Sequence, residues 1–77
     1  MREYNGHRSW NAWNVSLWIS NDEGIYNFAL DCLKRAKNNT ARASRLFMQD
    51  YRGAKTPDGA PYGVMTVKLA LTGLIES

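Results

Sequence analysis

Few side chains of this 77-residue chain could take part in catalysis, and their spacing along the sequence matches no catalytic group. No nucleophile motif surrounds any serine, and the one histidine, His7, stands in a polar segment after Gly6. Asp22 and Glu23 are neighbouring carboxylates, but adjacent residues of a helix point about 100° apart and cannot act on one substrate. Such a pair is typical of a helix N-terminus, where acidic side chains favour the positive end of the helix dipole. We therefore expect no enzymatic activity.

The sequence also lacks the residues that would form a metal or cofactor site. The chain has one cysteine and one histidine, whereas a structural zinc site needs four such ligands. There is no glycine-rich phosphate loop, and Asp58-Gly59 lacks the other ligands of a calcium loop. Cys32 falls on an apolar stripe, so we expect it to be buried as a small hydrophobic residue. No cofactor and no metal are expected.

The most informative polar feature is a concentration of positive charge. The segment 34–52 holds six basic residues against one acidic residue, Asp50, which is a net charge of +5 in a chain of net charge +3. The basic residues are Lys34, Arg35, Lys37, Arg42, Arg45 and Arg52. They form either a solvated face of two helices or an electrostatic patch for RNA, DNA or an acidic protein surface. Against nucleic acid, no aromatic residues alternate with the arginines, and few base-reading side chains accompany them.

Two central segments have the periodicity of amphipathic helices. Apolar residues recur with helical spacing between 22 and 37, and Asn21 can cap the start of this helix. A second helix is expected over 40–51, with Asn39 or Thr40 as its cap. If these helices form a hairpin, the six basic residues approach one another around the connection.

A turn and a last helix complete the second half of the chain. Gly53 follows the helix at 40–51, at a position where a left-handed residue is favoured. Residues 56–59, Thr-Pro-Asp-Gly, are a strong turn signal, since proline presets φ and glycine accepts positive φ. The final apolar stripe predicts a helix over 62–76, with Pro61 at its start.

The segment 9–19 is ambiguous between helix and strand. Its residue types favour a strand slightly. No other segment resembles a strand partner, however, and Ser9 is a good helix cap directly before the apolar pattern. We expect a helix, and therefore an all-α, compact bundle of four short helices. The strand alternative stays open, and it would require pairing with another copy or with a partner protein.

Three tryptophans lie within nine residues of this segment. So small a chain buries a limited share of its surface, and an indole contributes on the order of 150–250 Å² of contact area. We expect Trp10, Trp13 and Leu17 to fill the core shared by the helices. Trp18 lies towards the flank of the apolar face, and a partly exposed indole there would suit an interface.

The length and hydropathy of the chain limit its domain organisation and its cellular compartment. Seventy-seven residues make a single domain, 1–77. The polar start is not a signal peptide, and no apolar run reaches the roughly 20 residues of a membrane span. Together with one unpaired cysteine, this predicts a cytoplasmic protein with no membrane partner. Homo-oligomerisation would help to stabilise so small a core.

Two motifs resemble a known group of proteins. The opening, YNG followed by SWNAWNVSLWI and NDEGIY, resembles the pattern "YNGxxTWNVxLWIxNDExLY" of small proteins encoded by phages, plasmids and other mobile elements. The later TPDGAPY is similar to that group's "TPDGxxY" element. The resemblance covers most of the chain but carries no catalytic residues. It implies a genetic context, since such genes often stand among anti-restriction and anti-CRISPR genes.

The expected function is therefore binding. The first hypothesis is a counter-defence protein of a bacterial host cell that inhibits a host immune complex, above all a CRISPR–Cas effector, by stoichiometric binding. Because its charge is concentrated as cations, it would not mimic DNA, and it would contact an acidic protein surface or the RNA or DNA of the complex. The alternatives are a nucleic-acid-binding accessory protein that uses the basic surface, and a phage structural or assembly protein.

Overall fold

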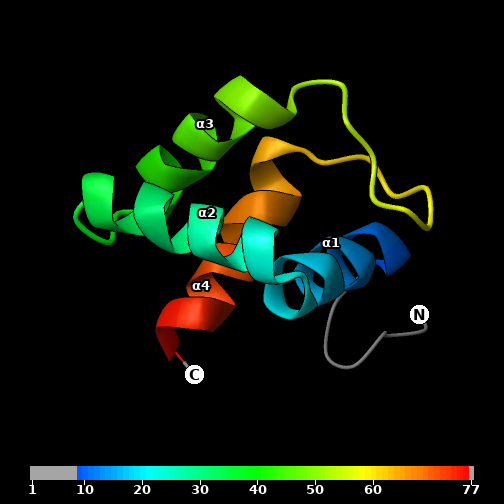
Figure 1. The fold of residues 1–77 in the computed structure, drawn as a ribbon, viewed down its shortest axis with the longest axis horizontal. Helices are drawn as coiled ribbons and strands as arrows, with labels where there is room; N and C mark the ends of the chain where they lie inside the picture. Colours follow the sequence, from blue (N-terminus) through cyan, green and yellow to red (C-terminus); the bar gives the residue numbers. More distant parts are fainter. Residues whose placement is uncertain (1–8, 77) are drawn as a thin grey trace.

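The computed structural model describes residues 9–76, and these form four helices with no strand among them (Figure 1). The helices are α1 (Trp10–Asn21), α2 (Glu23–Arg35), α3 (Thr40–Tyr51) and α4 (Val64–Glu76). The predicted all-α bundle is confirmed, and the strand alternative for the opening segment is wrong. His7 and the YNG motif lie outside the described residues.

Each helix packs against two neighbours, so the four form a closed ring around the core. The helix α4 lies against α1 and α3, and α2 crosses the other side of the same two helices (Figure 1). The largest buried side chains come from all four helices: Val15, Ile19, Cys32, Phe47, Val67 and Leu71. The core therefore holds together segments from both halves of the sequence.

Side-chain caps define the starts of three helices. Ser9 Oγ accepts from the Ala12 N–H at 3.1 Å, and Asn39 Oδ1 accepts from the Arg42 N–H at 3.0 Å. Both caps agree with the sequence prediction. The predicted cap Asn21 is wrong, because α1 continues through Asn21 and Asp22 caps α2.

Two further helix ends differ from the prediction. The helix α2 ends at Arg35 and not at 37, because Lys37 and Asn38 adopt left-handed φ angles of 54° and 64°. The last helix begins at Val64 and not at 62. Pro61 instead pairs with Lys55 in an isolated antiparallel bridge, which extends the chain before the helix starts.

The tryptophans do not fill the core, so this part of the prediction is wrong. Trp10 is 37% exposed, and Trp13 and Leu17 are half-buried. The buried stripe of α1 is formed by smaller residues at helical spacing, Ala12, Val15 and Ile19. At about 100° per residue, Trp10 lies nearly opposite this stripe, and Trp13 and Trp18 lie to either side of it.

The bulk of the core comes from a different aromatic group. Phe47 stacks on Tyr51 with a centroid distance of 4.4 Å, and Tyr62 meets Tyr51 edge-on at 5.0 Å. Phe28 of α2 joins them, 5.2 Å from Phe47. Offset and edge-to-face pairs of this kind contribute beyond the area they bury. The cluster connects α2, α3 and the segment before α4.

This assignment of the core predicts unequal effects of truncation in α1 and α4. Ile19→Val should lower the free energy of unfolding by about 0.5–1.5 kcal/mol and Ile19→Ala by about 2–5 kcal/mol, because a buried cavity is left. Met65→Ala, at a side chain that is 65% exposed, should change it by less than about 0.5 kcal/mol. Urea unfolding followed by circular dichroism measures all three. Equal effects at the two sites would contradict the assignment.

Candidate functional site

The connection between α2 and α3 positions the predicted basic residues. The Asn38 N–H donates to the Leu33 carbonyl at 2.8 Å, and the Lys37 N–H donates to the Lys34 carbonyl at 3.2 Å. These bonds satisfy carbonyls at the end of α2 while the two left-handed residues reverse the chain. Asn39 then caps α3, so hydrogen bonds fix the backbone of the whole connection between α2 and α3.

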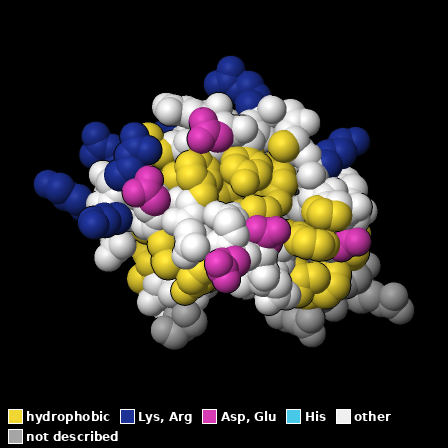
Figure 2. Space-filling model, viewed as in Figure 1, with side chains coloured by type: hydrophobic (Ala, Val, Ile, Leu, Met, Phe, Trp, Pro, Cys, Tyr) yellow, Lys and Arg dark blue, Asp and Glu magenta, His cyan; other side chains and the backbone are white. Residues whose placement is uncertain are grey.

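All six predicted basic residues are exposed. Figure 2 shows Lys and Arg side chains gathered at the end of the molecule where α2 passes into α3, with others standing apart from them. Among residues 9–76, the one ion pair is between Arg35 and Asp31, at 3.8 Å, and both partners are largely exposed. The remaining cations are therefore available to a partner.

The structure does not gather the six into one patch. Arg42 and Arg45 belong to α3, but Arg52 follows its last residue and is ten residues beyond Arg42, about 15 Å along the helix axis. Lys34, Arg35 and Lys37 belong to the end of α2 and its connection. We call Lys34, Arg35, Lys37, Arg42 and Arg45 the basic end. Arg52 extends it as a row along α3.

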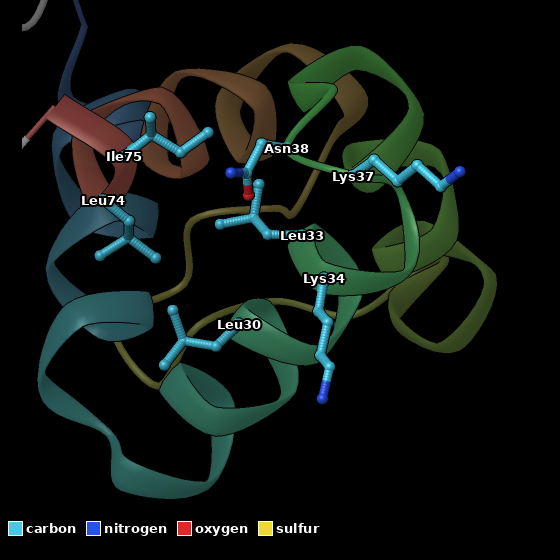
Figure 3. Close-up of a pocket in the computed structure, with 7 residues that line it drawn as sticks. All are labelled: Leu30, Leu33, Lys34, Lys37, Asn38, Leu74 and Ile75. Carbon is cyan, nitrogen blue, oxygen red and sulfur yellow. The ribbon is translucent and has the colours of Figure 1, made fainter.

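A hollow lies beside the basic end. Its volume is about 640 Å³, and residues of α2, α4 and the α2–α3 connection line it: Leu30, Leu33, Lys34, Lys37, Asn38, Leu74 and Ile75. Figure 3 shows Leu30, Leu33 and Leu74 turned towards the same space, while the ammonium groups of Lys34 and Lys37 extend away from it. The sequence did not indicate this hollow, because its walls come from α2 and α4, which are far apart along the chain.

Trp18, the other predicted interface residue, is not part of the basic end. It is half-buried, and its Nε1–H donates to Asp58 Oδ2 at 2.9 Å. Asn14, one turn earlier on α1, donates to the same oxygen at 2.9 Å. The segment 52–63 that carries Asp58 reaches the opposite end of the molecule from the α2–α3 connection (Figure 1). The indole therefore has a role in attaching this segment to α1.

Cys32 is fully buried, as predicted. Burial, followed by the nearby charge of Asp31, raises the pKa of its thiol, which disfavours the reactive thiolate. Among the described residues, no three His, Cys, Asp or Glu side chains lie close enough to hold a metal ion. No helix in this part of the chain is long and apolar enough to cross a membrane.

One family matches residues 1–76, and its description is "Family of unknown function (DUF7249)". The chain belongs to this family. No curated protein and no solved structure matches the chain. The match covers nearly the whole chain, but membership of DUF7249 carries no evidence of a phage or anti-CRISPR origin.

The two motifs of that resemblance meet in this DUF7249 chain. Thr56 and Asp58 of the TPDGAPY motif bond to Asn14 and Trp18 of the opening motif. The turn itself is closed by the Gly59 N–H, which donates to the Thr56 carbonyl at 2.8 Å. The residues that carry the resemblance thus include a contact that shapes the fold.

Acidic side chains lie on a face of the molecule that the sequence analysis did not predict. Figure 2 shows hydrophobic side chains across the middle of one face, with Asp and Glu side chains around them. Burial raises the pKa of Tyr51, and the charges of Asp22 and Asp50 raise it further. These acids lie near the aromatic cluster although they are far apart in the sequence. Local charge counting could not find them.

The bonds to Asp58 predict an effect on stability in acid. They lower the pKa of Asp58, with the bond from Asn14 as the larger cause and that from Trp18 as the second. A lowered pKa in the folded state contributes stability that is present above the unfolded-state pKa, about 3.9, and is lost as pH falls through the folded-state value. Asp58→Asn should therefore lose less stability than the unaltered chain below about pH 4.

Urea midpoints measured between neutral pH and strong acid test this effect. The carboxylate is exposed, so we expect a modest difference in slope. Asp50→Asn is the matched control, because it removes the same charge without touching Asn14 or Trp18. Identical acid dependence in Asp58→Asn and the unaltered chain would contradict the role given to Asp58.

Proposed function

We propose that this chain acts by binding, as a small counter-defence protein that inhibits a host immune complex, with a CRISPR–Cas effector as the first candidate. The observation that carries the proposal is the basic end, whose five cations are exposed and, apart from Arg35, form no ion pair among residues 9–76. Complementary charge on a partner would guide association and orientation. The resemblance to proteins of mobile elements supports the counter-defence role.

The positive charge of the basic end limits how the proposed inhibitor can act. A protein that mimics DNA must present carboxylates where DNA presents phosphates, whereas the basic end presents cations. The proposed inhibitor therefore covers an acidic surface of the complex or contacts its RNA or DNA. It does this without a cofactor and without catalysis, in a one-to-one ratio with its target.

Charge reversal at the basic end tests this proposal. Lys37→Glu combined with Arg42→Glu should weaken co-purification with the host CRISPR or restriction complex about tenfold or more, because attraction becomes repulsion. Lys55→Glu combined with Lys68→Glu changes the net charge equally at other positions and should bind nearly as well as the unaltered chain. Failure of the unaltered chain to associate with, or relieve, any such complex would remove the proposal.

A nucleic-acid-binding accessory protein is the second candidate. It is favoured by the row of Arg42, Arg45 and Arg52 along α3 and its C-terminal end, which spans about 15 Å and could follow a phosphate backbone. Direct titration with short DNA and RNA distinguishes the two candidates. Binding that weakens steeply with salt, and that Arg42→Glu and Arg45→Glu abolish, would favour this second function. Flat titrations at low salt would exclude it.

A further inference from the structure

The hollow beside the basic end combines an apolar floor with a charged rim. Leu30 is 39% exposed and Ile75 is 43% exposed, although both are large apolar side chains. They belong to α2 and α4, so both helices contribute exposed apolar side chains to the same hollow. Among residues 9–76, the polar side chains that line the hollow are Lys34, Lys37 and Asn38.

The two lysines contribute to this hollow in two ways. Both residues line it, and their side chains extend outwards so that the ammonium groups lie away from its centre (Figure 3). A long cationic side chain can cover apolar surface in this way while its charge stays in water. Groups at the edge of the hollow would therefore meet positive charge, and groups inside it would meet leucine and isoleucine.

We propose that the hollow receives apolar side chains from an acidic amphipathic helix of a partner protein, whose carboxylates meet Lys34 and Lys37. This inference rests on the proposed function, in which the basic end docks on a partner. A volume of about 640 Å³ is in the range of about 300–1,000 Å³ that occupied pockets show. That volume admits more than one side chain, as expected for anchors at i and i+3 or i+4 of a helix.

The surrounding backbone favours a preformed site. Lys37 and Asn38 both hold left-handed φ angles, and the bond from Asn38 N–H to the Leu33 carbonyl ties this wall to α2. A wall held in this way need not be ordered when the partner binds, which lowers the entropic cost of association. The lysine charges select an acidic partner over a basic one.

A synthetic amphipathic peptide of about 18 residues, with leucine on one face and glutamate on the other, probes the site. Titration into the isotope-labelled chain should shift the NMR signals of Leu30, Leu33 and Ile75 first. A matched peptide with lysine in place of glutamate should bind at least about tenfold more weakly. A peptide with serine in place of leucine should not bind.

Variants of the chain separate the hollow from other apolar surface. Ile75→Glu, and Lys34→Glu combined with Lys37→Glu, should each weaken binding of the glutamate peptide about tenfold. Leu69→Glu is the matched control, because Leu69 is an exposed apolar residue of α4 that does not line the hollow. It should leave the affinity unchanged.

Three outcomes would overturn the inference. The first is equal binding of the glutamate and lysine peptides, and the second is a set of NMR signal shifts confined to residues outside the hollow. The third is concentration-dependent dimerisation that Ile75→Glu abolishes, because it would assign the hollow to a second copy of the chain. The titration uses no host complex. Failure of the unaltered chain to co-purify with a host complex therefore removes the proposed function alone, whereas its failure to bind the glutamate peptide removes this inference alone.

Discussion

The fold depends on a buried polar contact between α1 and the segment before α4. Asn14 of α1 is 1% exposed. Its Oδ1 accepts from the Thr56 hydroxyl, which in turn accepts from the Ala60 N–H at 3.0 Å, and its Nδ2 donates to Asp58. A buried amide left without partners destabilises a fold by about 1–3 kcal/mol. The segment 52–63 is thereby held against α1.

That attachment has consequences for the core and for the candidate site. Ala60 and Tyr62 follow the turn and are buried, so the same segment delivers the last ring of the aromatic cluster. It also sets the point at which α4 begins. Because α4 supplies Leu74 and Ile75 to the hollow, a contact at one end of the molecule helps to position a surface at the other.

Local signals in the sequence were sufficient for the helices but not for their packing. The period of apolar residues and the caps Ser9 and Asn39 located the elements, and α3 begins and ends where predicted. The size of an indole does not decide its burial, since the core face of α1 holds Val15 and Ile19 while Trp10 is exposed. Asn14 could not be recognised as buried, since its partners lie 42 and 44 residues away. The six basic residues follow from composition, but the hollow beside them depends on how α1 and α3 hold α2 and α4 relative to each other.

The most direct measurement of the central claim is a double-mutant cycle between Asn14→Ala and Thr56→Val, both at buried positions. Urea unfolding of the four proteins gives the coupling free energy. If the two side chains hold the segment 52–63 on α1 together, the coupling should be about 1–2 kcal/mol, within the range found for residues in one hydrogen-bond network. Effects that add to within about 0.3 kcal/mol would contradict the account.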